Sequence, residues 1–295
     1  MIAHPSFVRV DCMKLISFDA LRTLHFPSTH YIKPDCYLQH DAEIESADWL
    51  LFPEYWQLNV LHYAYKKRIF PSPASYALGH DKVEMTRAFM AVAPEHVPFT
   101  LIHGNSPEKA DEIWQKMPRP FVAKIPKSSM GEGVFLIESL ADWHQYCLQT
   151  HVLYAQEYLP IDRDLRIVVI GDKVVGGYWR VQAENGFHNN IARGGTLLEG
   201  PLPESAVELV LKLAKTLGID HAGFDIAMIG HYPFVLEFNR MFGTQGINKI
   251  IGDTTPMILE YLNAAMNDED QPEDPDDPNG STPKGRRVRK PAIAA

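Results

Sequence analysis

The sequence predicts an α/β protein built from more than one subdomain. At 295 residues the chain is too long for one small core and suits two or three subdomains. Between Lys14 and about Ala93, short apolar stretches alternate with a helical one, a βαβ-like pattern typical of a small open α/β domain. Further along, two segments have the pattern of antiparallel hairpins. The composition, 45% hydrophobic and 22% charged, is that of a soluble globular protein.

Charge and cysteine usage exclude several classes of protein. The formal net charge of −9 gives no electrostatic reason to expect a nucleic-acid partner. No apolar run approaches the roughly 20 residues that a membrane span needs, and Met1–Cys12 lacks the pattern of a signal peptide, which makes Met13 a candidate for the natural start. Cys12, Cys36 and Cys147 are scattered. We therefore expect a cytoplasmic protein with free thiols that contacts neither membrane nor nucleic acid.

The first third of the chain gives structural signals and no catalytic group. Strands are expected at Leu15–Phe18, Trp49–Phe52 and Arg68–Phe70, with a helix over Trp56–Lys67. Four histidines lack a carboxylate or cysteine at metal-ligand spacing and are expected at the surface: His25, His30, His40 and His62.

A new helix is expected after the break at Pro71-Ser72-Pro73, starting near Gly79 and continuing to about Val92. Lys82 lies in its first turn, where the helix dipole disfavours a cation. The residue is either a solvated surface lysine or a contact to a phosphate held by the same helix end.

The stretch from Pro120 to Ile137 has the composition of a phosphate-binding hairpin. A strand carrying Lys124 leads into the loop Ser128–Val134 and then a second strand. Glycines let backbone N–H groups approach an anion, and the lysine supplies a positive charge. The loop lacks the ending of a Walker loop, and a plain hairpin can share its composition. The next strand, Tyr154–Pro160, could meet an adenine edge through its backbone, or could simply be a strand end.

A second hairpin is expected around Gly171-Asp172, between strands Asp164–Ile170 and Lys173–Arg180. A regular two-residue turn places Arg166 opposite Gly177, where a guanidinium could lie flat and reach a phosphate or carboxylate. The following glycine-rich stretch, 183–195, has the composition of a mobile loop that carries Arg193. Helices are expected at Glu204–Leu217 and Thr255–Met266, the first with this apolar face: Val207, Val210, Leu211, Ala214 and Leu217.

The segment Gly223–Asn239 predicts a metal-binding hairpin. Centring its turn on His231 pairs Ile229 with Pro233, Ala227 with Val235 and Asp225 with Glu237. Asp225, Glu237 and Asn239 then converge, and three hard oxygen donors suit Mg²⁺. An ordinary polar hairpin rim would show the same residues. The opposite, apolar face would hold Ile226, Met228, Phe234, Leu236 and Phe238.

Taken together, these motifs resemble the ATP-grasp superfamily, and within it the RimK-like carboxylate–amine ligases. The matching segments occur in the family order from about Ser72 to Gly246: Asp81-Lys82, Lys124 with its glycine loop, Gln156-Glu157-Tyr158, Asp164-Leu165-Arg166, Asn189-Asn190 with Arg193-Gly194-Gly195, Gly223-Phe224-Asp225 and Glu237-Phe238-Asn239. The resemblance implies an α/β protein with α+β subdomains: an ATP-grasp fold behind an N-terminal open α/β (pre-ATP-grasp) domain. The expected division is 13–75 for the N-terminal domain, 76–155 and 156–266 for the two ATP-grasp subdomains, and 267–295 for a disordered tail.

The resemblance also implies roles for individual residues. The nucleotide would be held by Lys82, Lys124, Ser129, Gly131, Gly133, Gln156, Glu157, Tyr158, Asp164, Asn189 and Asn190. Among these, Glu157 and Tyr158 would meet the adenine and Asp164 the ribose. Asp225, Glu237 and Asn239 would bind Mg²⁺, with Mn²⁺ as a substitute. Arg166 and Arg193 would be catalytic and, with Arg240, would supply charge for binding carboxylates.

The implied chemistry transfers the ATP γ-phosphoryl group to a carboxylate and then forms an amide with an amine. The acid would belong to a peptide, protein or small molecule, and the amine to an amino acid such as glutamate. Relatives often form dimers or tetramers, which leaves both states open here. Two departures affect the substrate side: Arg240-Met241-Phe242-Gly243 replaces small residues and a proline, and His188-Asn189 replaces Arg-Ser. A kinase on the same scaffold and a nucleotide-binding regulatory module are the competing functions.

Overall fold

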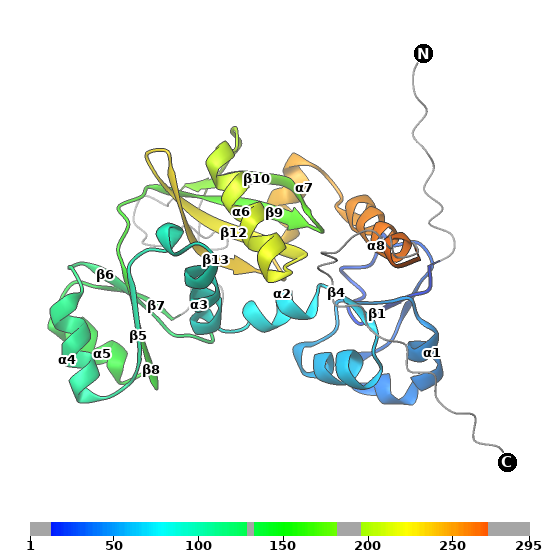
Figure 1. The fold of residues 1–295 in the computed structure, drawn as a ribbon, viewed down its shortest axis with the longest axis horizontal. Coiled ribbons are helices and arrows are strands. Elements are labelled where there is room, and N and C mark those ends of the chain that lie inside the picture. Colours follow the sequence, from blue (N-terminus) through cyan, green and yellow to red (C-terminus); the bar gives the residue numbers. More distant parts are fainter. Residues whose placement is uncertain (1–12, 129–132, 182–195, 271–295) are drawn as a thin grey trace, which may run out of the picture.

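The computed structural model describes residues 13–128, 133–181 and 196–270. Its elements form three parts in a row, each built on its own sheet (Figure 1). The N-terminal part lies at one end, the sheet of β5 to β8 lies at the other, and the largest sheet lies between them. Within the described ranges, no helix combines the length and apolar character that crossing a membrane requires.

The N-terminal part is a parallel four-stranded sheet in the order β2-β1-β3-β4. Its strands are β1 (Leu15–Ser17), β2 (Thr29–Tyr31), β3 (Trp49–Leu51) and β4 (Arg68–Phe70), with α1 (Asp41–Ser46) and a 3₁₀ helix, η2 (Pro34–Gln39), beside them. β1 and β3 are buried along their whole length, as central parallel strands are. The expected open α/β domain is confirmed.

The expected helix over Trp56–Lys67 forms as a continuous helical stretch from Tyr55 to Ala64. It begins with 3₁₀ geometry, η3 (Tyr55–Gln57), and ends with π geometry, η4 (Val60–Ala64), and the chain leaves helical geometry at Lys66, whose φ is 55°. Leu58 and Leu61 are buried, as the apolar spacing predicted. The expected helix is therefore confirmed, although its turns are not regular α-helical ones.

The second part is an antiparallel sheet in the order β5-β8-β6-β7. Its strands are β5 (Thr100–Gly104), β6 (Phe121–Lys124), β7 (Val134–Ile137) and β8 (Val152–Glu157). Two helices, α4 (Pro107–Lys116) and α5 (Leu140–Cys147), pack on it. Ile113, Phe121 and Trp143 belong to the core between helices and sheet. This packing leaves Lys124 at the end of β6, next to the loop that leads to β7.

The central part is a five-stranded antiparallel sheet in the order β11-β10-β9-β12-β13. Its strands are β9 (Arg163–Ile170), β10 (Lys173–Val181), β11 (Thr196–Leu198), β12 (His221–Ile229) and β13 (Tyr232–Asn239). Alternate residues of β9 enter two different cores. Ile167 packs in the core that includes α3 (Lys82–Val92) and α6 (Glu204–Leu217), and Val168 in the core that includes α8 (Thr255–Asp270). Both faces of the sheet are therefore covered.

Several helical predictions need correction. The bounds of α6 are as expected, and most of its predicted face meets the core: Val210 and Ala214 are buried, and Val207 and Leu217 pack against it. Leu211 is not part of that core, and the buried stripe also includes Ala206, Leu209 and Leu213. A further helix, α7 (Thr244–Ile250), replaces an expected turn-rich stretch, and α8 runs four residues past Met266. The Pro-Ser-Pro break is followed at once by α2 (Pro73–Leu78), because Ser72 caps it by accepting a hydrogen bond from the Ser75 N–H.

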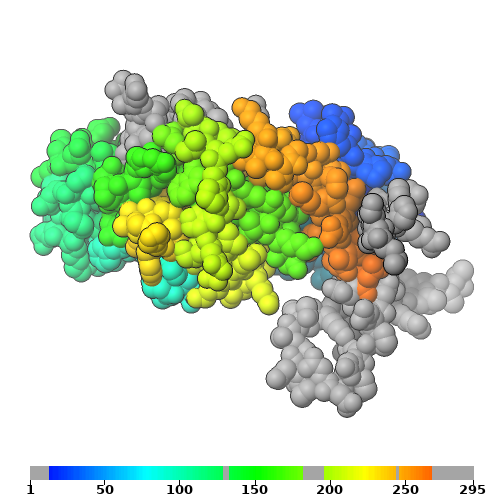
Figure 2. All heavy atoms as spheres, turned by 90° about the horizontal axis from the view of Figure 1, so that it is seen from above, coloured from blue at the N-terminus to red at the C-terminus, as the bar shows by residue number. Residues whose placement is uncertain are grey.

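The N-terminal part is joined to the central sheet by buried contacts. Figure 2 shows the C-terminal helices lying against the first residues of the N-terminal part, where Leu15 shares a core with Ile258. Asp220 accepts a hydrogen bond from the Ser72 N–H at 2.7 Å, and burial raises the pKa of this carboxyl to about 6. Residues from the N-terminal part thus border the central sheet.

Candidate active site

The hairpin of β12 and β13 places Asp225 directly opposite Glu237 and Gly223 opposite Asn239, as expected. Two departures from regular pairing lie behind this agreement. The turn has two residues instead of three, so Ile229 faces Tyr232, and a bulge between Asp225 and Ile226 then shifts the pairing by one. The predicted pairs of Ile229 with Pro233 and Ala227 with Val235 are therefore wrong, while the end of the hairpin that carries Asp225, Glu237 and Asn239 keeps the expected register.

The same bulge changes which side chains face the core. Val235 and Phe238 are buried in the core shared with α3 and α6, whereas Phe234 and Leu236 are only half-buried. The predicted apolar face is correct for Phe238 and wrong for Phe234 and Leu236. An extra residue in a strand turns every side chain beyond it to the other face.

Asp225 is held by two arginines. The Arg166 Nε and Nη2 donate to its two carboxylate oxygens at 2.5 and 3.1 Å, and the Arg180 Nη2 lies 3.0 Å from Oδ2. Asp225 is only 4% exposed. Burial would raise its pKa, but the charges of Arg166 and Arg180 outweigh it and hold that pKa below its ordinary value. A carboxylate has about four lone-pair positions, so one on Oδ1 is left for a further partner such as a metal.

Arg166 lies opposite Tyr178, which corrects the expected pairing with Gly177. A bulge between Val174 and Gly176 shifts the ladder by one residue. The guanidinium does lie over a glycine, but this is Gly223 on β12, where an added Cβ would approach Arg166 Cδ and Nη1 to 2.8 Å. Gly223 is therefore needed for the close approach of Arg166 to Asp225.

Arg180 is a site residue that the sequence pattern missed. Its Nε and Nη2 donate to the two oxygens of Asp164 at 2.7 and 2.6 Å, and both residues are buried. Burial raises the pKa of Asp164, although the Arg180 charge opposes the shift. Without the bulge, a regular ladder would have placed Trp179 opposite Asp164, so no sequence signal pointed to the pair. The expected ribose contact of Asp164 stays a prediction.

Lys124 is 7% exposed and its ammonium donates to Gln156 Oε1 at 2.8 Å. The amide of Gln156 in turn donates to Thr100 Oγ1 at 2.9 Å and to the Tyr154 hydroxyl at 3.2 Å. The Lys124 ammonium also lies 5.5 Å from the centre of the Tyr154 ring. This connected network fixes the direction of the lysine side chain. Thr100 and Tyr154 were not predicted, because their pairing across strands depends on a register that the sequence does not reveal.

The charge of one carboxylate, Glu237, acts on both Lys82 and Lys124. The Lys82 ammonium donates to the Ser128 carbonyl and, at 3.4 Å, reaches the Ser128 hydroxyl at the start of the glycine loop. Burial lowers the pKa of both lysines, and the charge of Glu237 is the largest opposing influence on each. The Lys82 N–H also donates to the Pro126 carbonyl at 3.1 Å, and Met85 accepts from the Phe238 N–H at 3.3 Å, so α3 contacts both the loop after β6 and the end of β13.

Glu237 and Asn239 are the remaining members of the expected metal set. The Asn239 Nδ2 donates to Glu237 Oε1 at 3.4 Å, which directs the amide oxygen of Asn239 elsewhere. Among the described residues, no cation forms an ion pair with Glu237. Two carboxylates and an amide oxygen are hard donors of the kind that Mg²⁺ prefers, so the residues present fit this ion.

Several expected nucleotide contacts cannot be placed or remain predictions. Ser129, Gly131, Asn189, Asn190 and Arg193 lie outside the described residues. Gly133 has φ +68°, and a Cβ there would come within 2.8 Å of Ser128 Oγ, so the loop needs glycine at this position.

The strand-end residues were expected to meet the adenine. Glu157 is tied to Phe99: its N–H donates to the Phe99 carbonyl at 2.8 Å, and its carboxylate accepts from the Phe99 N–H at 2.9 Å. This N–H is therefore not free for an adenine edge. The roles of Glu157 and Tyr158 stay predictions.

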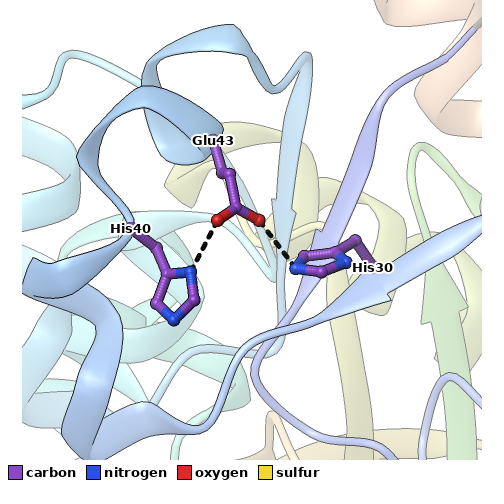
Figure 3. A group of neighbouring side chains, drawn as sticks. All are labelled: His30, His40 and Glu43. Carbon is purple, nitrogen blue, oxygen red and sulfur yellow. Dashed lines mark hydrogen bonds and ion pairs between the residues drawn. The ribbon is translucent and has the colours of Figure 1, made fainter.

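A second group of metal-type ligands lies in the N-terminal part. His30 Nε2 and His40 Nδ1 each lie 2.7 Å from an oxygen of Glu43 (Figure 3). His25 likewise lies 3.0 Å from Asp253. The expectation of surface histidines is confirmed for His30, which is exposed, but the expected lack of carboxylate partners is wrong. His40 and Glu43 stand three residues apart, a spacing that the sequence does contain.

Comparison with known proteins agrees with this geometry. The family model of the RimK-like ATP-grasp domain matches residues 80–262. A probable alpha-L-glutamate ligase from Xanthomonas euvesicatoria is 30% identical over 206 residues, which cover 66% of this chain and 69% of the relative. Another protein of that name, from Citrobacter koseri, is 32% identical over 212 residues, with coverages of 66% and 70%.

Solved structures share the fold at low sequence identity. A RimK domain protein ATP-grasp from Sphaerobacter thermophilus has a TM-score of 0.59 at 16% identity, covering 73% of this chain and 81% of that one. A D-alanine–D-alanine ligase from Bacillus anthracis has a TM-score of 0.62 at 12% identity, with coverages of 82% and 88%. The ATP-grasp architecture is therefore confirmed. The chain belongs to the RimK-like ATP-grasp family and is an ATP-dependent carboxylate–amine ligase.

Proposed function

We propose that this enzyme uses Mg·ATP to activate a carboxylate as an acylphosphate and then joins it to the amino group of an amino acid, with glutamate as the first candidate. A carboxylate oxygen bonds to the γ-phosphorus as the bond to ADP breaks. The amine nitrogen then bonds to the acyl carbon, inorganic phosphate leaves, and the amine releases a proton. The observation that carries the proposal is the contact of α3 with both the loop after β6 and the end of β13, which gathers Lys82, Lys124 and Glu237 in one region.

The two lysines would hold the nucleotide phosphates. Phosphoryl transfer needs positioning and neutralised charge more than a protein nucleophile. Lys124 is buried with its ammonium directed by Gln156, which is unfavourable for a charge unless an anion joins it. A phosphate would supply that anion. Lys82, beside Ser128 at the start of the glycine loop, would act on the same group.

Glu237 and Asn239, together with the remaining lone pair of Asp225, would hold Mg²⁺, with Mn²⁺ as a substitute. Bound there, the ion would neutralise charge on the β- and γ-phosphates. The described side chains do the rest of the positioning: Arg166 and Arg180 keep the Asp225 carboxylate fixed and ionised. The expected catalytic role of Arg166 is therefore proposed to act through Asp225, while the roles of Arg193, Asn189 and Asn190 remain as the family resemblance implies.

The choice of glutamate follows from the names of the relatives, which are probable alpha-L-glutamate ligases. The acid that receives it would be the carboxylate of a peptide, a protein tail or a small molecule. The two competing functions predict different products: a kinase would leave a phosphoester, and a regulatory module would release no ADP.

The test is product analysis with the full chain. The enzyme is incubated with Mg·ATP, L-glutamate and a pool of peptides and metabolites, and masses that appear only with ATP are identified. In parallel, hydroxylamine replaces the amine, because an acylphosphate reacts with it to give a hydroxamate. We expect ADP, phosphate, an amide product and a hydroxamate. A phosphoester without hydroxamate would replace the proposal by the kinase, and ATP binding without ADP release would replace it by the regulatory module.

A further inference from the structure

Arg240 follows directly after Asn239, and its side chain has an unmet hydrogen-bonding group. Its guanidinium carbon lies 4.6 Å from the centre of the Tyr76 ring and 6.0 Å from that of Tyr55. Its Nε is buried and has no hydrogen-bond partner. Among the described side chains, none forms a hydrogen bond or ion pair with this guanidinium. Arg240 is therefore a cation placed on an aromatic surface without a counter-ion in the described part of the chain.

An unpartnered buried N–H is unfavourable and calls for an explanation. Leaving such a donor without a partner costs about 1–3 kcal/mol, and few are found in native structures. A guanidinium stacked on a ring keeps its in-plane N–H groups available, and their fork geometry fits a carboxylate. A carboxylate ligand would satisfy the Arg240 Nε and supply the missing negative charge.

The backbone of Arg240 is held from two directions. The His221 imidazole lies 2.6 Å through Nδ1 from the Arg240 carbonyl and stacks on Phe242 at 4.7 Å. Burial lowers the pKa of His221 to about 3, so the ring is neutral and its Nδ1–H donates to the carbonyl. Arg22, from the N-terminal part, donates to the carbonyls of Met241 and Phe242 at 3.3 and 3.5 Å. The position of Arg240 is therefore fixed before any ligand binds.

Stacked rings beside Arg240 extend towards the start of the helix that carries Lys82, the lysine proposed to hold phosphate. Tyr55 stacks on His80 with ring centres 4.0 Å apart, and His80 stands two residues before Lys82. The charges that act most on the Tyr76 hydroxyl are, in order, those of Arg240, Glu54, Arg22 and Asp220. Two arginines thus face this aromatic surface, and neither Glu54 nor Asp220 forms an ion pair with Arg240.

We propose that Arg240, supported by Tyr76 and Tyr55, binds a second carboxylate of the acid substrate, the one that is not phosphorylated. This rests on the proposed function. The acid would then be dicarboxylic: one carboxylate reaches Lys124 and the metal ligands, and the other lies against Arg240. Adjacent residues in the chain, Asn239 and Arg240, would thereby contact the two ends of one small acidic group.

The test compares two probes that differ in one charge. N-acetyl-L-glutamate and N-acetyl-L-glutamine are titrated calorimetrically into the full chain saturated with Mg²⁺ and a non-hydrolysable ATP analogue. We expect the dicarboxylate to bind at least about 10-fold more tightly, in keeping with a charge-assisted bidentate hydrogen bond. Arg240→Ala should abolish this preference, and Arg240→Lys should restore part of it.

Arg119→Ala is the matched control. Arg119 also lies over a ring, 4.7 Å from the centre of Trp114, but stands in the short connection between α4 and β6, in a different part of the molecule. The Arg119→Ala variant should leave the preference for the dicarboxylate unchanged. If Arg240→Ala does not fold, Arg240→Met, which keeps the aliphatic stem on Tyr76, replaces it.

An unchanged preference in the Arg240 variants, or a wild-type chain that binds neither probe or both equally, would overturn the inference. The hydroxamate assay separates this result from the proposed function. Ligation that is indifferent to Arg240 rejects only the inference. Selective binding that depends on Arg240, without any acylphosphate, rejects only the proposed function.

Discussion

Asp225 and Glu237 face each other across the β12–β13 hairpin, yet their carboxylates have different electrostatic surroundings. Asp225 is bonded at both oxygens by Arg166, and Arg180 adds a third contact. Among the described residues, Glu237 has only the weak contact from the Asn239 amide at 3.4 Å, and its charge acts on Lys82 and Lys124. Two carboxylates in this arrangement would ordinarily repel. Because the arginines offset the charge of Asp225, Glu237 is the larger negative influence on Lys124, with Asp225 the smaller one.

The first prediction concerns Glu237→Gln. This variant removes the unpaired carboxylate and keeps the shape of the side chain. We expect the rate of ADP release to fall on the order of 100-fold or more, because a preorganised electrostatic group contributes about that much. The free energy of unfolding should change little, since no ion pair among the described residues is broken. ADP release is measured against Mg²⁺ concentration, with thermal unfolding in parallel. Wild-type rates would reject the metal-site assignment.

The second prediction concerns Asp225→Asn, which should destabilise the fold as well as stop turnover. The change removes one of two buried anions and leaves Arg166 without a charged partner, while Arg180 keeps Asp164. Breaking a buried ion pair costs about 3–5 kcal/mol, which urea denaturation measures directly. Asp162→Asn is the control, because its pair with Arg163 is exposed and should contribute little. Equal stability of the Asp225 and Asp162 variants would contradict a structural role for Asp225.

The hairpin also illustrates how far the sequence could predict the site. The pairing of Asp225 with Glu237 was predicted from alternation alone, although a turn shorter by one residue and a bulge of one residue each shifted the ladder. The two shifts cancel. In β9–β10 a single bulge has no compensating shift, so Arg166 was placed opposite the wrong residue and the Arg180–Asp164 pair was missed. Bulges depend on packing between sheets, which a single strand's pattern does not encode.

Features that depend on neighbouring residues were predicted better than features that depend on residues far apart in the chain. The bounds of α6 were predicted correctly because its apolar spacing and the closing Gly218 are local signals. Its buried face was predicted only in part, since Leu211 is not in the core and Leu209 and Leu213 are, because the exact face depends on where α3 and the sheet lie. The Lys124–Gln156 bond joins residues 32 positions apart, and its link to Thr100 requires the register of β5 on β8. Residue identities at the site were predictable by resemblance, whereas the network that orients them was not.

The third prediction concerns Lys124→Met. We expect affinity for Mg²⁺ with a non-hydrolysable ATP analogue to fall about 10- to 100-fold, as expected for losing a hydrogen bond to a charged group. The stability of the nucleotide-free chain should change by less than about 2 kcal/mol, because relief from burying a charge offsets the lost partner of Gln156. Calorimetric titration and urea denaturation measure the two quantities.

Lys116→Met is the control for this variant, since Lys116 is exposed and paired with Glu112 in the same part of the molecule. Its nucleotide affinity should equal that of the wild type. Unchanged affinity in Lys124→Met would place the phosphates elsewhere, and the convergence of Lys82, Lys124 and Glu237 would need another explanation.

The fourth prediction concerns His221 and the pH dependence of stability. His221 is 3% exposed, and burial lowers the pKa of its imidazole from about 6.5 to about 3. The unfolded chain therefore takes up a proton below pH 6.5 that the folded chain does not accept until about pH 3. The contribution of His221 to the free energy of unfolding is therefore fully present above pH 6.5 and is lost as the pH falls. The loss is at most about 1.4 kcal/mol per pH unit and on the order of 5 kcal/mol in total.

His221→Gln isolates this contribution, because glutamine can still donate to the Arg240 carbonyl but does not titrate. The neighbouring Asp220, whose pKa burial raises to about 6, has the opposite sign: it favours the folded state less as the pH rises through about 4 to 6. Since Asp220 is present in both chains, its effect cancels in their difference. Urea denaturation between pH 4 and 8 should show a constant difference between wild type and variant above pH 6.5, and a wild-type advantage that shrinks steadily below it. A difference independent of pH would mean that folding does not lower the pKa of His221, and the ring that holds the Arg240 carbonyl would then become charged below about pH 6.5 in the folded chain as in the unfolded one.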